Sequence, residues 1–207
     1  MYMKVLLFNG SPNKNGAVSR ALSEVEGVLN SKGIETMRLD IGKAAVRGCN
    51  DCGKCRGENR CVYNDIVNDV IEAMETCDGM VIGAPVYYAG INGSVKSVLD
   101  RVFFAGGYTF KYKVGAAVVN ARRAGTTTAY EEINKYFAIS GMIISPSCYW
   151  NMTHGNSAEE AEKDIEGMGI MRVIGNSMAW LLKVLEDGKK KYGIPKKIPV
   201  DKFNFIH

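Results

Sequence analysis

The sequence predicts an α/β fold in which a five-stranded parallel sheet carries helices on both of its faces. Short, continuously apolar segments alternate along the chain with longer segments of helical periodicity, which is the pattern of a parallel sheet buried on both sides. The chain has 207 residues, of which 46% are hydrophobic and 23% charged. This composition is ordinary for a globular protein, and the length allows one domain to bury a large core.

The first elements follow directly from the N-terminus. Residues 4–9 are an apolar run closed by Gly10, which predicts a buried strand. Residues 16–32 repeat apolar side chains at helical spacing, and Gly33 is well placed as the C-terminal cap of that helix. The apolar run 34–39 then predicts the second strand.

The middle of the chain continues the same alternation after a loop. Residues 43–64 are rich in Cys, Gly and Asn and predict a long loop, and residues 66–75 return to helical spacing. Residues 79–85 are apolar and predict the third strand. Residues 94–104 predict a helix with one apolar face, formed by Val95, Val98, Leu99 and Val102.

The last third supplies the remaining strands. Residues 114–119 predict the fourth strand, and a polar loop at 120–128 leads into a helix that ends near residue 140. Residues 142–147 predict the fifth strand. Residues 149–170 show no regular period, and 171–185 predict the final helix.

Five strands in this rhythm fit a doubly wound sheet of the flavodoxin-like order 2-1-3-4-5. No repeat or linker divides residues 1–187, so we expect one domain there, followed by a Lys-rich C-terminal tail at 188–207. Ligands bind such sheets at the carboxyl ends of the strands. The loops after the first, third and fourth strands are therefore the expected binding loops.

The charge distribution argues against a nucleic-acid ligand. The formal net charge is +4, but residues 188–207 hold six Lys against one Asp, so the body of the chain is close to neutral. Nucleic-acid binding requires basic residues spread over a folded face. No apolar run approaches the roughly 20 residues that span a bilayer, and the N-terminal run is too short for a signal peptide. We therefore expect a soluble cytoplasmic protein without a membrane partner.

The loop after the first strand has the composition of a phosphate-binding turn. Residues 10–19 hold two Gly, two Asn and two Ser, without the spacing of a dinucleotide fold or a P-loop. The free N–H groups of the following helix add partial positive charge. A phosphomonoester held by neutral donors, as in flavodoxin-type FMN sites, suits this loop, and a plain capped turn is the alternative. The candidate residues are Ser11, Asn13, Gly16 and Ser19.

Two further loops would complete a site for a planar ring. After the third strand, aromatic faces and backbone donors suit an isoalloxazine ring, and packing on a helix or a partner subunit is the alternative. The candidates there are Pro85, Val86, Tyr87 and Tyr88. After the fourth strand, N–H groups and an Arg would stabilise a reduced flavin, and a solvated loop is the alternative. The candidates there are Asn120, Arg122 and Gly125.

Three short motifs together carry a family resemblance. They are Gly-Ser-Pro at residues 10–12 with Gly16, Ala-Pro-Val-Tyr at 84–87, and Leu-Asp-Arg at 99–101. In these the chain resembles the NADPH-dependent FMN reductase family over roughly residues 3 to 185. Within that family the cysteine spacing resembles the iron-sulfur flavoproteins. The resemblance implies a flavodoxin-like fold, bound FMN, electron transfer, and association into a homodimer or homotetramer.

Four of the six cysteines, Cys49, Cys52, Cys55 and Cys61, fall within 13 positions. In a cytoplasmic chain such clustering indicates metal or redox chemistry rather than disulfides. Four thiolates hold a 4Fe-4S cluster, and C-x2-C-x2-C runs let one loop wrap three of its corners. Zinc sites usually use two C-x2-C pairs that are well separated in the sequence, whereas here the pairs overlap, which favours an iron-sulfur cluster. A zinc site, and four reduced thiols without a metal, are the alternatives. Cys77 and Cys148 stand in apolar contexts and are expected to be buried.

These observations predict an FMN-dependent oxidoreductase in which the flavin carries the chemistry and no side chain is catalytic. With a cluster, electrons would pass from a ferredoxin-like donor through the cluster to FMN, across a subunit interface as the resemblance suggests. Without one, NAD(P)H would reduce FMN, and a quinone or free flavin would accept the electrons. A non-catalytic flavin- or zinc-binding regulatory module is the second alternative. His154 and His207 are poor catalytic candidates, and Trp150 with segment 149–170 is expected at an interface.

Overall fold

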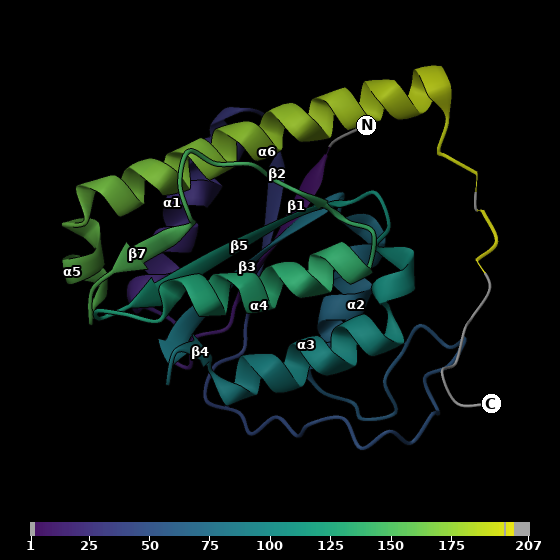
Figure 1. Ribbon diagram of the computed structural model, residues 1–207, viewed down its shortest axis with the longest axis horizontal. Helices are drawn as coiled ribbons and strands as arrows, with labels where there is room; N and C mark the ends of the chain where they lie inside the picture. Colours follow the sequence, from purple (N-terminus) through teal and green to yellow (C-terminus); the bar gives the residue numbers. More distant parts are fainter. Residues whose placement is uncertain (1–2, 197, 201–207) are drawn as a thin grey trace.

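The computed structural model describes residues 3–196 and 198–200, and a parallel sheet forms its centre (Figure 1). The strands lie in the order β2-β1-β3-β5-β6, and all neighbouring pairs on this path are parallel. Counted along the chain without the hairpin strand β4, this is the expected order 2-1-3-4-5, so the predicted fold class is confirmed. The strands are β1 (Lys4–Asn9), β2 (Glu35–Asp40), β3 (Gly79–Tyr87), β5 (Val114–Ala121) and β6 (Ile143–Ile144).

Helices cover both faces of the sheet and divide the core into two halves (Figure 1). Along β1, Val5 and Leu7 face one half while Leu6 and Phe8 face the other, as the two-residue period of a strand requires. One face carries α1 (Ala17–Ser31), α5 (Ala158–Glu162) and α6 (Ile165–Tyr192). The opposite face carries α2 (Ile66–Thr76), α3 (Gly93–Ala105) and α4 (Thr126–Ile139), with the short 3-10 helix η1 (Gly107–Thr109) after α3.

The third strand runs longer than expected and ends in a hairpin. After Tyr87 the chain turns through Tyr88 and Ala89, and β4 (Gly90–Ile91) pairs antiparallel with the end of β3. Both turn residues have positive φ, 50° and 60°. A two-residue hairpin turn of this kind usually carries Asn-Gly, so Tyr-Ala gave no signal for it.

The expected fifth strand is replaced by two short ones. Only Ile143–Ile144 form β6, and β7 (Met152–His154) pairs in parallel with the far end of β5. Between them lies Pro146, which has no N–H to donate to a sheet. The segment expected to be irregular, 149–170, therefore contains β7, α5 and the first turns of α6.

The last helix is longer than the predicted 171–185. The Asp164 side chain accepts a bond from the Gly167 N–H at its start, and three Lys in its last turn complement the helix dipole. The expected boundary of the tail at residue 188 thus lies inside α6. By length and composition α6 is the one helix in the described ranges that could cross a membrane, but 44% of that window is buried. Lys197, His207 and the rest of 201–207 lie outside the described residues.

Candidate active site and cysteine cavity

A cleft of about 260 Å³ opens where β1, β3 and β5 end. Three predicted loops line it together with the segment after β7. Among the described residues of its lining none is acidic, and Arg122 adds a positive charge, so the cleft suits an anion. Eight of the predicted residues line the cleft, namely Ser11, Asn13, Gly16, Pro85, Val86, Tyr87, Asn120 and Arg122.

The loop from β1 to α1 is fixed by short-range hydrogen bonds. The Asn9 side chain accepts a bond from the Ser11 N–H at 3.1 Å, and the Ser11 hydroxyl accepts one from the Asn13 N–H at 3.1 Å. The Gly10 N–H donates to the Gly83 carbonyl of β3 at 2.8 Å. These bonds tie the loop to the edge of the sheet.

The N-terminus of α1 faces this cleft without a side-chain cap. Its N-cap is Gly16, and its first turn contains no acidic residue. Asp65, Ser157 and Asp164 cap α2, α5 and α6, whereas α3 and α4 also lack a side-chain cap; α1 is distinguished because its first turn lines the cleft. The unpaired N–H groups and the positive end of the helix dipole make α1 an anion site. The residues present therefore fit the phosphate end of FMN.

Three predicted residues lie outside the lining of the cleft. The Ser19 hydroxyl accepts a bond from Arg38 on β2 at 2.6 Å, so it is already engaged. Tyr88 stands fully exposed at the tip of the β3–β4 turn. Gly125, with φ of 91°, packs under that turn, where an added Cβ would come within 2.6 Å of the Ala89 Cα.

Asn120 supports the cleft wall from beneath. Its side-chain N–H donates to the Gly155 carbonyl, and its oxygen accepts a bond from the Thr153 hydroxyl, each at 2.9 Å. These bonds hold the chain after β7, where Gly155 and Asn156 also line the cleft. Both residues were missed from the sequence because β7 was not predicted. His154 beside them is partly exposed and lies 3.6 Å from Asp164.

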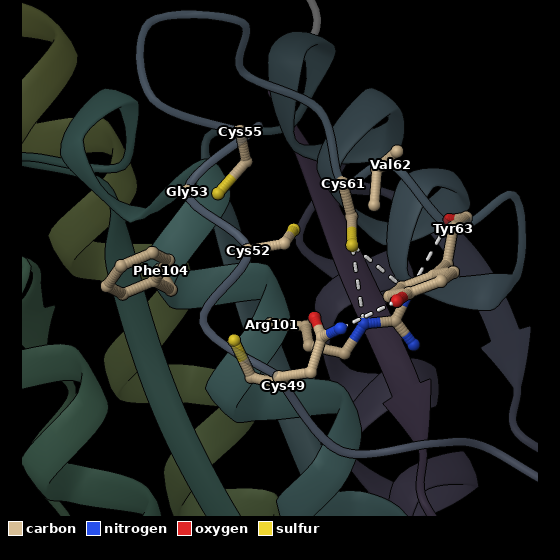
Figure 2. Close-up of a pocket in the computed structure, with 10 residues that line it drawn as sticks. Cys49, Cys52, Gly53, Cys55, Cys61, Val62, Tyr63, Arg101 and Phe104 are labelled. Atoms are coloured by element: carbon tan, nitrogen blue, oxygen red, sulfur yellow. Dashed lines mark hydrogen bonds between the residues drawn. The ribbon is translucent and has the colours of Figure 1, made fainter.

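The four clustered cysteines line a second, much smaller cavity of about 20 Å³ (Figure 2). Cys49 and Cys52 are exposed, whereas Cys55 and Cys61 are partly buried. Within residues 3–196 and 198–200, no group of three or more Cys, His, Asp or Glu is arranged to hold a single metal ion. Four thiols around one cavity are the donor set of a 4Fe-4S cluster, so the chemistry of these side chains fits that group.

The thiols influence one another in this cavity. Burial raises the pKa of the Cys55 thiol, and the charges of Cys61, Cys52 and Cys49 raise it further. Positive charge close to these sulfurs would therefore favour the thiolate form of Cys55. Left-handed backbone at Gly53 and Gly57, with φ of 68° and 86°, provides the tight turns of the loop.

Arg101 of α3 forms the base of the cysteine cavity and was not predicted as a site residue. Its side chain is almost fully buried and donates to Cys61 Sγ from Nη2 at 3.2 Å and from Nε at 3.4 Å (Figure 2). It also forms a two-pronged pair with Asp65, at 2.7 and 3.0 Å. Burial alone would lower the pKa of Arg101, but the bonds to Asp65 and Cys61 outweigh it and raise the pKa.

The cavity and the cleft lie on different parts of the molecule. The cysteine loop crosses the outer side of α3 (Figure 1), and Arg101 and Phe104 from the second half of that helix line the cavity. The described linings of the cavity and of the cleft have no residue in common. Of the other cysteines, Cys77 is buried as expected. Cys148 is exposed, contrary to expectation, because it lies in the connection between β6 and β7 outside the sheet.

Comparison with known proteins agrees with this geometry. Residues 3–157 match the family model described as NADPH-dependent FMN reductase. An iron-sulfur flavoprotein of Methanocaldococcus jannaschii is 28% identical over 192 residues, which cover 89% of this chain and 100% of that protein. An iron-sulfur flavoprotein of Archaeoglobus fulgidus is 32% identical over 147 residues, covering 70% of this chain and 72% of that protein.

The fold itself recurs in solved structures of low sequence identity. The crystal structure of RosB with a bound riboflavin-5'-phosphate intermediate superposes with a TM-score of 0.72 at 11% identity. The match covers 99% of this chain and 92% of RosB, and it supports the fold alone. On the family model and the curated relatives, the chain belongs to the NADPH-dependent FMN reductase family, in its iron-sulfur flavoprotein branch.

Proposed function

We propose that this chain is an electron-transfer oxidoreductase that binds FMN in the cleft at the carboxyl ends of β1, β3 and β5, with a 4Fe-4S cluster held by Cys49, Cys52, Cys55 and Cys61. The observation that carries the proposal is the uncapped N-terminus of α1, which opens onto a cleft lined without acidic residues. When bound, FMN takes up electrons singly or in pairs, and a cluster takes them up singly.

The described residues have distinct roles in binding the flavin. The N–H groups at the start of α1, with Ser11 and Asn13, bind the phosphate. Pro85, Val86 and Tyr87 line the same cleft and would hold the ring and limit the access of water to it. Arg122 supplies positive charge near the ring, where it favours an anionic reduced flavin. No side chain acts as an acid or base in this scheme.

Electron exchange between subunits is the second part of the proposal. The separate linings of cavity and cleft support transfer between the cysteine loop of one copy and the FMN of another, in a homodimer or homotetramer. The half-exposed Tyr149 and Trp150, which pack edge to face at 4.8 Å, are candidates for that contact. A ferredoxin-like protein is the proposed donor, NAD(P)H the alternative, and the cytoplasm the proposed compartment.

An anaerobic absorption spectrum, with flavin, iron and sulfide determined per chain, tests this proposal. The wild-type protein is expected to show the blue absorption of oxidised flavin and the broad brown shoulder of a cluster. Cys52→Ser is expected to lose the shoulder and keep FMN, whereas Cys148→Ser, a matched change at an exposed cysteine outside the cavity, keeps both. A protein without flavin after incubation with FMN would contradict the proposal.

A reduction assay on the same samples separates the two electron sources. Reduction of FMN by a low-potential ferredoxin that Cys52→Ser abolishes would support transfer through the cysteine loop. Equal reduction of both proteins by NAD(P)H would instead favour the cluster-free reductase.

A further inference from the structure

The bonding of Arg101 cannot be explained by helix packing alone. It lies on α3 and is 1% exposed, yet all six of its side-chain hydrogen bonds go to the cysteine loop or to the N-cap of α2. Besides Asp65 and Cys61, the guanidinium donates to the Arg47 and Tyr63 carbonyls at 3.3 and 3.4 Å. All of its bonds therefore converge on residues 47–65, which include the four cysteines and end at the N-cap of α2.

A buried Arg is costly unless its charge and its donors are matched. Asp65 matches the charge, and it also caps α2 through a bond to the Val67 N–H. The sulfur of Cys61 takes two of the remaining donor directions, from Nη2 and Nε. The geometry thus directs a permanent positive charge and two N–H groups at one sulfur of the four.

We propose that Arg101 is a positioning residue that holds Cys61 in place as the fourth cluster ligand and raises the reduction potential of the bound 4Fe-4S cluster. This inference rests on the proposed function, because it requires that the four cysteines hold a cluster. It adds a role for a helix residue outside the cysteine loop.

The direction of the effect follows from charge. Reduction adds one negative charge, which is shared with the thiolate ligands. N–H donors and positive charge beside a ligand sulfur stabilise that reduced form more than the oxidised form, and hydrogen bonds to the sulfurs are among the established determinants of cluster potential. Asp65 acts in the opposite sense, because its negative charge offsets part of the guanidinium field.

Arg101→Gln, Asp65→Asn and Arg60→Gln in the full-length protein, reconstituted with iron and sulfide, test the inference by redox titration. Arg101→Gln removes the charge and is expected to shift the oxidised–reduced equilibrium about tenfold toward the oxidised form, which is about 59 mV for one electron. Asp65→Asn keeps an N-cap side chain and is expected to raise the potential. Arg60→Gln is the matched control, since Arg60 is exposed and pairs with Glu72 rather than with a sulfur.

Arg101→Lys covers the case in which Arg101→Gln does not fold. It keeps the charge but cannot reproduce both N–H···S bonds, so a smaller downward shift is expected. The potential of FMN should be unchanged in every variant, because Arg101 does not line the cleft. If the role of Arg101 were purely structural, the variants would change stability or iron content, but the Arg101 and Asp65 variants would not shift the reduction potential of the cluster in opposite directions.

The outcomes distinguish this inference from the proposed function. Wild-type potentials in the Arg101 and Asp65 variants, or shifts of the same sign in both, would overturn the role of Arg101 and leave the cluster proposal intact. A wild-type chain that takes up no iron and sulfide would overturn the cluster proposal itself, and that result is visible before any variant is made.

Discussion

Substitution of Gly10 by Ala tests the binding loop where it approaches the sheet most closely. An added Cβ would lie 2.1 Å from the Val95 Cγ2 and 2.8 Å from the Gly83 carbonyl oxygen, whereas ordinary contacts begin at 3.4 Å. The Gly83 oxygen also accepts the Gly10 N–H, so the loop cannot retreat without losing that bond. The end of the Val95 side chain can adjust, but the Gly83 oxygen is sheet backbone, so the loop itself must also move.

The expected cost follows from this crowding. Overpacking of a buried site typically costs about 1–3 kcal/mol. For a chain of this size that lowers the melting temperature by about 2–12 °C. The loop must also shift away from α3, and this shift moves Ser11 and Asn13 out of position. Losing one hydrogen bond to a charged phosphate costs about 1.5 kcal/mol or more, so FMN should bind at least about tenfold more weakly.

Thermal unfolding of the apoprotein and fluorescence titration with FMN measure both effects. Gly27→Ala is the control, because an added Cβ there meets nothing within 4 Å, and it should stabilise α1 by about 0.5–1 kcal/mol without changing FMN affinity. Gly10→Ala with Val95→Ala should lose less stability than the two single changes together. Wild-type stability and FMN affinity in Gly10→Ala would refute the reasoning.

Three further predictions concern other contacts. Ala89→Gly should raise the free energy of unfolding, measured by urea titration, by up to about 1 kcal/mol, because φ at this turn residue is 60°; a lower urea midpoint than that of the wild type would contradict this. Asp65→Ala should cost about 3–5 kcal/mol in urea unfolding by removing the α2 cap and leaving buried Arg101 unpaired, and Asp65→Asn, which keeps a cap, should cost less. Burial alone would raise the pKa of Glu24, but hydrogen bonds from two arginines, Arg172 among them, outweigh burial and lower the pKa from its ordinary value of 4.5. The stability that this carboxylate contributes is therefore present above pH 4.5 and is lost as the pH falls below that value. The stability difference between wild type and Arg172→Gln should therefore be larger at pH 7 than at pH 3, and an equal difference would count against the pair.

Most of the fold was predictable because its long elements have strong periodic signals. The runs in β1, β3 and β5 are apolar on both sides, since helices cover both faces of the sheet. The short strands β4 and β7 could not be found in this way, and β6 was predicted, within residues 142–147, but at too great a length. Each holds two or three residues, too few for a period, and each forms only because β3 or β5 offers it an edge.

The two candidate sites differ in how much the sequence revealed. Strand order alone indicated which loops meet at the cleft, so Ser11 and Tyr87 were found without a structure. Asn156 was missed because its position depends on β7. Arg101 was noted only as part of a motif, because its burial depends on Asp65 and Cys61, which are 36 and 40 residues away in the chain. Contacts between residues so far apart in the chain depend on the tertiary fold, so no local sequence pattern predicts them.

The central claim, that the start of α1 and its loop bind the phosphate of a flavin, is tested most directly by comparing two ligands. Apoprotein is titrated with FMN and with riboflavin, and the quenching of flavin fluorescence is followed. FMN should bind one to one, and at least about tenfold more tightly than riboflavin, because only FMN carries the phosphate. Equal affinities would place the phosphate outside the α1 loop, and no binding of either ligand would remove the flavin from the cleft altogether.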